Sequence, residues 1–269
     1  MSVRIIDCFT FYNELELLNY RLNLLNDIVD YFILVEATHT FMGKEKCLYY
    51  LENKHLFEKF NSKIIHIIVD DMPYLTNINT NTGEQWENER FQRNSITRGF
   101  KYIKNLNNSD LIIISDVDEI PDPNTLQAIH NNHIQVSYNI LMMDMYYYNL
   151  NTKFNYNWYH VKIISYEMFK RLNRTCDSIR MGQAFSTIGN GGWHLSYFGD
   201  ANFIKNKIEN FSHQEYNNSN YTDISIIEER INNNKDLYGR DNLPIERVPL
   251  KSNNYLPVHY EKYLSRFYS

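Results

Sequence analysis

Three carboxylates follow an apolar run in the segment LIIISDVDEIP, residues 111–121. Asp116 and Asp118 are two residues apart, and Glu119 follows directly. Ligands of open α/β sheets bind at the carboxyl ends of the strands, so acids in this position matter more than acids elsewhere. Carboxylates at this spacing are hard oxygen ligands that can hold Mg²⁺ or Mn²⁺ against the phosphates of a ligand. The segment therefore predicts a divalent cation site, with a solvated acidic turn as the alternative.

Two classes of enzyme carry Asp-x-Asp at the end of a strand. In phosphatases of the haloacid dehalogenase type, the first aspartate is a nucleophile, the second is an acid or base, and Thr or Val normally follows two residues later. Here Glu119 and Ile120 follow, and the motif lies in the middle of the chain. Metal-dependent glycosyltransferases with the GT-A fold need a nucleotide-binding half before the motif. The segment before Leu111 is long enough for such a half, which favours the second class.

The elements that must position these acids alternate along the first half of the chain. Apolar runs predict strands, and apolar residues at helical spacing predict helices between them. The predicted strands are 3–11, 31–38, 63–73 and 111–115, and the predicted helices are 13–29 and 87–106. Alternation at this spacing predicts an α/β fold with a mostly parallel sheet and right-handed crossovers. Glu14 follows the first strand and Glu36 lies at the end of the second, so both are expected at the same edge as Asp116 and Asp118.

The second half of the chain predicts a more varied set of elements. They are a helix at 123–132, a long strand or hairpin arm at 135–151, a strand running into a helix at 160–172, a turn and strand at 189–200, helices at 201–211 and 223–234, an irregular tail at 242–255 and a helix at 256–267. No repeat or linker divides the chain. One domain, 1–269, is expected, with a nucleotide-binding half of about 1–121 and an acceptor-side half of about 122–269.

Composition narrows the class of partner. The 269 residues carry a net charge of −5, which gives no general electrostatic attraction to nucleic acid or to anionic membranes. No apolar stretch approaches the roughly 18 residues of a membrane span, and the start of the chain is too short and too acidic for a signal peptide. The three cysteines lie far apart, which fits neither a disulfide framework nor a zinc site. A soluble, cytosolic protein is expected.

Three motifs together resemble glycosyltransferase family 17. They are IIDCFTFYNELELLNYRLNLLNDIVDYFILVEATHTFMGK, SDVDEIP and GGWHLSYFG, in this order and between Ile5 and Tyr216. The family contains the β-1,4-mannosyl-glycoprotein β-1,4-N-acetylglucosaminyltransferases that add bisecting GlcNAc. The resemblance implies a GT-A, Rossmann-like fold, a UDP-sugar donor such as UDP-GlcNAc, a glycan hydroxyl as acceptor, a divalent cation and inversion at the anomeric carbon. Animal members carry an N-terminal membrane anchor, whereas this chain begins almost at its first strand, which fits a microbial or viral source.

The resemblance also implies roles for residues around the motif. Asp116, Asp118 and His194 would hold Mn²⁺ or Mg²⁺, a Lewis acid that stabilises the departing diphosphate. Arg93, in the sequence FQRN, would contact the diphosphate, because a guanidinium matches phosphate oxygens. A salt bridge from Arg93 to Glu89 one turn earlier is the alternative.

Four further residues have a ligand role and a structural alternative. Glu36 is expected to accept hydrogen bonds from the ribose or uracil, or else to serve as a cap or surface charge. Asn13 and Glu14 would touch the nucleotide, although Glu14 could instead stabilise the start of a helix. Trp193 would stack on a sugar or fill the core.

The catalytic base is expected among Asp144, Asp200 and Glu215. Asp200 directly precedes a predicted helix, so an N-cap role already explains it. Glu215 lies in a polar break between helices and is the predicted base, with Asp118 contributing to catalysis through the cation. Two other functions stay open from the residues alone: a metal-dependent phosphohydrolase that uses the Asp116 and Asp118 pair, and a non-catalytic sugar-binding module.

Overall fold

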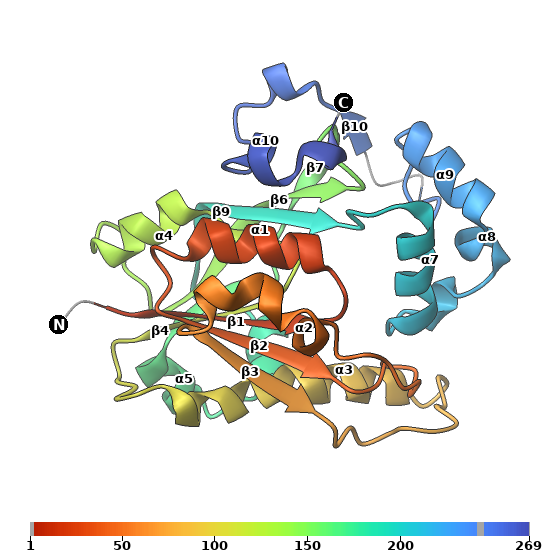
Figure 1. Cartoon of the computed structure of the whole chain (residues 1–269). Coiled ribbons are helices and arrows are strands. Elements are labelled where there is room, and N and C mark those ends of the chain that lie inside the picture. The colour runs from red at the N-terminus through yellow and green to blue at the C-terminus, as the bar shows by residue number, and fades with distance from the viewer. Residues whose placement is uncertain (1–2, 241–244, 269) are drawn as a thin grey trace.

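The first part of the chain folds as alternating strands and helices, as its apolar pattern predicts (Figure 1). The computed structural model describes residues 3–240 and 245–268. Four neighbouring strands are parallel, in the order β3 (Ile64–Val69), β2 (Tyr31–Ala37), β1 (Ile5–Phe11) and β4 (Leu111–Asp116). The loop after β4 therefore opens at the same sheet edge as the loops after β1 and β2.

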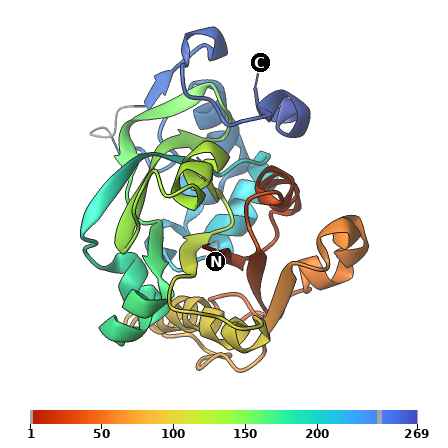
Figure 2. The same ribbon diagram turned by 90° about the vertical axis from the view of Figure 1, so that its left-hand side faces the viewer.

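Helices cover both faces of the parallel strands (Figures 1 and 2). Strand side chains alternate between faces. Ile5 and Phe9 therefore pack in the cluster that contains α1 (Leu15–Leu25), whereas Ile6 and Cys8 pack in the opposite cluster. That second cluster lies against α3 (Glu84–Asn94) and the 3₁₀ helix η2 (Ser95–Tyr102). Gly99 lets η2 approach β2, since a Cβ there would lie 2.8 Å from Ile33.

The sheet as a whole is mixed rather than parallel throughout. The added strands are β5 (Glu119–Pro121), β6 (Tyr138–Tyr147), β7 (Thr152–Trp158), β8 (Lys162–Ser165), β9 (Ser186–Ser196) and β10 (Ile245–Arg247). β8 pairs antiparallel with β4 and with β6, and β7 pairs antiparallel with β6 and β10. The α/β prediction is confirmed. The run of four parallel strands lies in the first half of the chain, and the second half adds antiparallel strands, because short connections such as the one between β6 and β7 permit only antiparallel pairing.

Strand β9 joins the second half of the chain to the Asp-x-Asp loop. It runs parallel to β6 and pairs antiparallel with β5, where Glu119 lies opposite His194. Gly192 makes this approach possible, because its φ is positive and a Cβ there would clash with the Ile120 carbonyl oxygen. Only glycine adopts such a conformation without strain. The glycines before Trp193 therefore place His194 beside the loop.

The remaining helices are short. They are α2 (Tyr49–Glu52), η1 (Lys54–Phe60), α4 (Pro123–His130), α5 (Tyr166–Leu172), α6 (Cys176–Met181), α7 (Ala201–Asn210), η3 (Gln214–Tyr216), α8 (Ser219–Thr222), α9 (Ile224–Asn232), η4 (Leu250–Ser252), α10 (Tyr260–Tyr263) and η5 (Ser265–Phe267). Asp200 caps α7 through the Phe203 amide, as predicted. Within the described ranges, no helix combines the length and the apolar character needed to cross a membrane.

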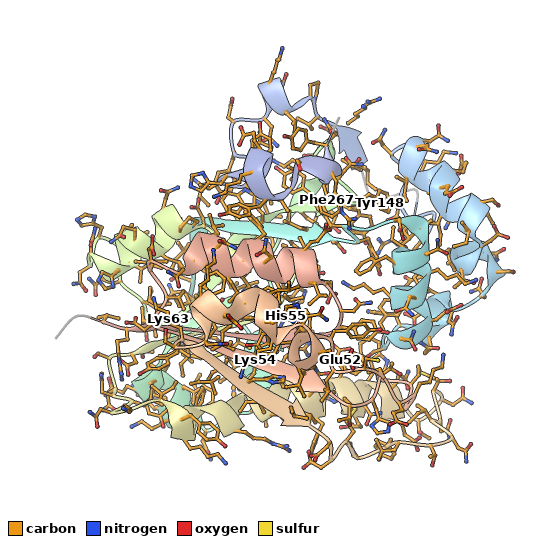
Figure 3. All side chains as sticks on the ribbon, in the orientation of Figure 1. Glu52, Lys54, His55, Lys63, Tyr148 and Phe267 are labelled. Carbon is orange, nitrogen blue, oxygen red and sulfur yellow. The ribbon has the colours of Figure 1, made fainter. Side chains whose placement is uncertain are left out.

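Two predicted helices are broken in the structure. The helix expected at 87–106 is α-helical only as far as Asn94 and continues as η2. The helix expected at 256–267 divides into α10 and η5, because His259 is left-handed and Leu264 lies outside the helical region. Phe267 of this tail is labelled in Figure 3, and its carbonyl accepts a 2.8 Å hydrogen bond from the Leu150 amide, shortly after the end of β6. Residues 241–244 of the expected irregular tail lie outside the described ranges.

A buried ion pair crosses from α1 to the sheet. Asp7 faces α1 from β1, and its carboxylate accepts hydrogen bonds of 2.8 and 2.6 Å from Arg21. Both side chains are fully buried. The guanidinium also donates to the carbonyl oxygens of Asp116 (2.9 Å) and Glu119 (2.7 Å) and to the Ser115 hydroxyl (2.7 Å). Arg21 therefore ties the Asp-x-Asp loop to the first helix.

Replacing Arg21 should destabilise the fold strongly. Arg21→Met would leave Asp7 buried without its cation, a loss that costs about 3–5 kcal/mol in the free energy of unfolding. Arg98→Met is the matched control, because Arg98 and Asp71 form an exposed pair, and such pairs are worth about 1 kcal/mol or less. Urea unfolding measures both. Equal losses in the two variants would contradict the role assigned to Arg21.

Candidate active site

A cavity of about 420 Å³ opens at the carboxyl ends of the parallel strands. Its volume lies within the usual range of about 300–1,000 Å³ for small-molecule sites. The lining comes from the ends of β1 and β4, from β5, β9, α3, α6 and α7, and from the loop after β2. Thr10, Asp116 and Asp118 contribute from the strand ends, and His194 contributes from β9.

The loop after β4 is held by its own acid. Glu119 is fully buried, and its Oε2 atom accepts a 2.7 Å hydrogen bond from the amide of Asp116. Its Oε1 atom accepts a 2.5 Å hydrogen bond from the indole of Trp158 and is ion-paired with Arg180. Burial raises the pKa of Glu119, and the charge of Arg180 opposes this effect. Glu119 therefore shapes the loop that carries Asp116 and Asp118.

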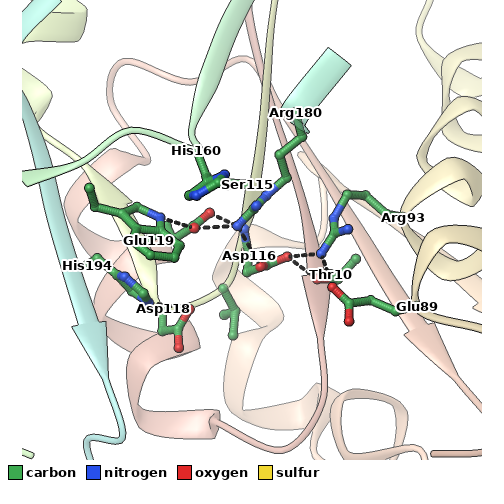
Figure 4. A network of polar contacts seen from close by, with 12 residues as sticks. Thr10, Glu89, Arg93, Ser115, Asp116, Asp118, Glu119, His160, Arg180 and His194 are labelled. Carbon is green, nitrogen blue, oxygen red and sulfur yellow. Dashed lines mark hydrogen bonds and ion pairs between the residues drawn. The ribbon is translucent and has the colours of Figure 1, made fainter. Parts of the chain in front are cut away.

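Asp116 lies between two guanidinium groups (Figure 4). Its Oδ1 atom is 2.7 Å from the Thr10 hydroxyl and 3.4 Å from Arg93, and its Oδ2 atom is 2.8 Å from Arg180. Burial by itself would raise the pKa of this carboxyl, but the charges of Arg180 and Arg93 outweigh it and lower the pKa to about 2. Asp116 is an anion at neutral pH.

Asp118 contacts a lysine and a histidine instead of arginines. Its Oδ2 atom is 2.9 Å from the Lys207 ammonium, and its Oδ1 atom is 3.7 Å from Nε2 of His194. Burial opposes ionisation, but Lys207 and His194 hold the pKa of Asp118 far below its usual range. Lys207 also contacts Glu14 at 3.0 Å. Burial would lower the pKa of Lys207, but these two carboxylates raise it well above normal.

Histidine and tryptophan rings form one wall of the cavity. The ring centroid of Trp158 lies 4.5 Å from the ring centroids of both His160 and His194. Burial and the charge of Arg180 lower the pKa of His160 to about 4, so this imidazole is neutral at pH 7. Nδ1 of His194 is buried and has no hydrogen-bond partner among the described residues. This wall offers the neutral imidazole of His160, the nitrogen atoms of His194 and an apolar surface.

The structure brings five of the predicted site residues into the lining of one cavity. They are Glu14, Arg93, Asp116, Asp118 and His194. Arg93 forms the salt bridge to Glu89 that was the structural alternative, at 2.7 Å, and also contacts Asp116 and Asp177. Its side chain thus joins α3 to the loop after β4.

Four other predicted residues lie outside this lining. Glu36 is fully buried, and its carboxylate accepts from the Tyr50 amide (2.9 Å) and contacts His66 (3.0 Å). Trp193 is fully buried in the core and donates to the Tyr255 carbonyl. Asn13 lies beside Glu14 at the start of α1, and the backbone N–H of Asn13 donates a hydrogen bond to the Glu14 carboxylate. Glu215 is exposed and contacts the ring of His213, which does line the cavity.

Three residues of the site were not indicated by the sequence. Arg180, Lys207 and Trp158 supply contacts to the acidic loop, but none lies in one of the three family motifs. Lys207 could have been noticed from its position in the sequence. It lies on the apolar side of α7 with the buried residues Ile204 and Ile208, and a lysine is unusual on such a face. Arg180 and Trp158 left no such local signal.

The donor atoms of the site suit a divalent cation in type. Two carboxylates and an imidazole are ligands that Mn²⁺ accepts, and Nδ1 of His194 is a buried nitrogen without a partner among the described residues. In the described arrangement, however, the oxygens of Asp116 and Asp118 face Arg93, Arg180, Lys207 and His194. Within the described part of the chain, no group of three His, Cys, Asp or Glu side chains is arranged to hold a metal ion.

Charged groups gather where the parallel strands end, which is where ligands of open α/β sheets bind. A model of glycosyltransferase family 17 matches residues 1–247, and the chain belongs to this family. It is similar to proteins of Rattus norvegicus and Homo sapiens that are named beta-1,4-mannosyl-glycoprotein 4-beta-N-acetylglucosaminyltransferase, with 30% identity to each over 123 residues. The matched segment covers 44% of this chain and 22% of each relative.

The ion pairs of Asp116 should make stability depend on acid pH. The pKa of Asp116 is about 2 in the folded protein and about 3.9 for an unfolded aspartate. Its stabilisation is therefore present above about pH 4 and is lost as the pH falls toward 2. Arg180→Met should bring the two pKa values closer and reduce the loss of unfolding free energy between pH 5 and 2. Urea unfolding at a series of pH values measures this slope.

The control for this slope is an exposed arginine. Arg266→Met removes the partner of Glu16 in a pair whose two side chains are both exposed. Because exposed pairs contribute little to stability, this variant should leave the acid slope unchanged. If the unfolding free energy of Arg180→Met falls with pH as steeply as that of the wild type, the low pKa of Asp116 does not depend on Arg180.

Proposed function

We propose that the chain transfers GlcNAc from UDP-GlcNAc to a hydroxyl group of a glycan. The match to glycosyltransferase family 17 over residues 1–247 carries this proposal, and the names of the curated relatives supply the sugar. The parallel strands and the position of the cavity fit the nucleotide-binding half of a GT-A fold. The proposed reaction is an in-line displacement with inversion at the anomeric carbon.

The cavity offers cations for the diphosphate of the donor. Arg93 and Arg180 are both buried, and both line the cavity beside Asp116. The Nε atom of each is buried without a hydrogen-bond partner in the described part of the chain. Guanidinium groups match phosphate oxygens in pairs of hydrogen bonds, so these two side chains could bind the diphosphate and stabilise its charge as it leaves.

The proposal includes Mn²⁺ or Mg²⁺ at the Asp-x-Asp carboxylates. Asp116, Asp118 and His194 are the residues proposed to hold it, and the ion would supply Lewis-acid stabilisation of the leaving group. The buried guanidinium of Arg21 holds the loop in place through the carbonyl oxygens of Asp116 and Glu119. This support orients the carboxylates before any ligand binds.

The acceptor is proposed to enter from the side of α3 and α7. Trp86 lines the cavity there, with its ring edge-on to His213 at 4.5 Å, and could stack on a sugar. Glu215 is proposed as the base that takes the proton of the acceptor hydroxyl. Its Oε1 atom is 2.7 Å from Nδ1 of His213, which lines the cavity. This contact holds the Glu215 carboxylate near the mouth of the cavity.

Binding of UDP should depend on the loop after β4. We expect isothermal titration to show UDP binding that strengthens with Mn²⁺, and donor hydrolysis that is fastest with UDP-GlcNAc among UDP-GlcNAc, UDP-Glc, UDP-Gal and GDP-sugars. Asp118→Asn should weaken metal-dependent binding at least about tenfold, because one charged oxygen ligand is lost. Asp71→Asn, which alters the exposed partner of Arg98, is the control.

Each alternative function gives a different result in this experiment. A phosphohydrolase would release inorganic phosphate from phosphomonoesters, and a sugar-binding module would bind glycan without UDP or metal. The transferase proposal would be wrong if the protein neither binds UDP nor hydrolyses any nucleotide sugar, with or without Mn²⁺.

Removing the proposed base should slow transfer without weakening donor binding. Glu215→Gln should lower kcat for transfer by at least about 100-fold, the usual contribution of a general base. The dissociation constant for UDP should stay unchanged, because Glu215 lies outside the cavity lining. Glu209→Gln on α7, where Glu209 pairs only loosely with Lys205 at 3.9 Å, is the control. A kcat within threefold of the wild type would assign the base to another carboxylate.

A further inference from the structure

The cavity contains a lysine that has no acidic partner at ion-pair distance among the described residues. The other lysine and arginine side chains of the lining each pair with a carboxylate, in the pairs Arg90–Glu87, Arg93–Glu89, Arg180–Asp116 and Lys207–Asp118. Lys46 lines the same cavity, and the one hydrogen bond of its ammonium within the described ranges is a 3.2 Å contact with the Cys47 carbonyl oxygen. An ammonium has three N–H donors, so most of its capacity is not used by contacts within the described chain.

The loop after β2 holds Lys46 in place. The backbone N–H of Lys46 donates to the Thr38 carbonyl oxygen at 2.9 Å, and the N–H of Thr40 donates to the Lys44 carbonyl oxygen at 2.8 Å. Gly43 turns the loop with a φ of 71°, a left-handed conformation that glycine adopts without strain. This closed turn fixes the backbone of Lys46 at the carboxyl end of β2.

Two aromatic rings lie beside the ammonium of Lys46. Its Nζ atom is 5.4 Å from the ring centroid of Tyr12, which also lines the cavity, and 5.5 Å from that of Tyr49. Burial lowers the pKa of Lys46, and the charges of Glu36 and Glu14 oppose this effect. Aromatic rings attract a cation less strongly than a carboxylate in contact would. The charge of Lys46 is therefore only partly compensated within the described chain.

An anionic ligand would complete this compensation. A phosphate oxygen accepts a hydrogen bond and neutralises the ammonium at the same time, whereas a neutral oxygen of a base or sugar only accepts a hydrogen bond. The guanidinium groups of Arg93 and Arg180 already share their charge with several carboxylates. Among the described cations of the lining, Lys46 thus gains the most from an anion.

We propose that the ammonium of Lys46 binds a phosphate group of the nucleotide-sugar donor. This assignment rests on the proposed function, because the donor supplies the phosphate. Lys46 would act as a binding residue, with no bond made or broken at its nitrogen. The UDP that leaves after transfer carries the same phosphates, so Lys46 would contact both the donor and this product.

Isothermal titration of the full chain with uridine, UMP and UDP tests the contact. Lys46→Met should weaken UDP binding about tenfold or more, because a hydrogen bond between two charged groups is lost, and should leave uridine binding unchanged. Lys46→Gln keeps a donor without the charge and should lose as much, which also covers the case in which Lys46→Met does not fold. Lys46→Arg should retain most of the affinity. Lys44→Met is the matched control, because Lys44 is exposed on the same loop and lies outside the lining.

The outcomes separate this assignment from the proposed function. Equal UDP affinity in the wild type and the two uncharged variants, or an equal loss for uridine and UDP, would overturn the phosphate contact and leave the proposed function standing. UDP binding to Lys46→Met that weakens with NaCl as steeply as in the wild type would also overturn it, since the loss of a charge contact reduces the dependence on salt. A wild-type protein that binds neither UMP nor UDP, with or without Mn²⁺, would contradict both.

Discussion

The position of the acidic loop depends on the hydrogen bonds of one buried guanidinium, that of Arg21. An isolated charge in the protein interior is costly. Arg21 is tolerated only because Asp7 and several oxygens of the loop after β4 surround it. The same contacts fix the backbone that carries Asp116 and Asp118. Helix α1, strand β1 and the acidic loop are thus joined by one residue, and none of them can shift without leaving the charge unsatisfied.

Charge compensation is the second constraint on the site. Asp116, Asp118 and Glu119 are close neighbours in the sequence, and like charges so near one another in a cavity wall would repel. The fold gives each acid a cationic partner: Arg93 and Arg180 contact Asp116, Lys207 contacts Asp118, and Arg180 also contacts Glu119. These cations come from α3, α6 and α7, so the acidic loop holds together the two halves of the chain.

The mixed part of the sheet completes a cavity that the parallel part only begins. The parallel strands deliver Thr10 and the acidic loop to one edge. Strand β9 then pairs with β5 and brings His194 opposite Glu119, while the strand end at Trp158 closes over the same carboxylate. The family match covers residues 1–247 and therefore includes both the parallel strands and the strands that complete the cavity.

The sequence by itself determined the parallel strands, helix α1 and the position of three acids at a strand end, because these features follow from local apolar periodicity. It also identified the family through three motifs. Only the tertiary structure decided the mixed sheet, the turning of Glu36 toward Tyr50 and His66, and the roles of Arg180 and Lys207. Lys207 meets Asp118 across 89 positions and Glu14 across 193. Contacts between residues so far apart leave no periodic signal, since packing of whole elements selects them.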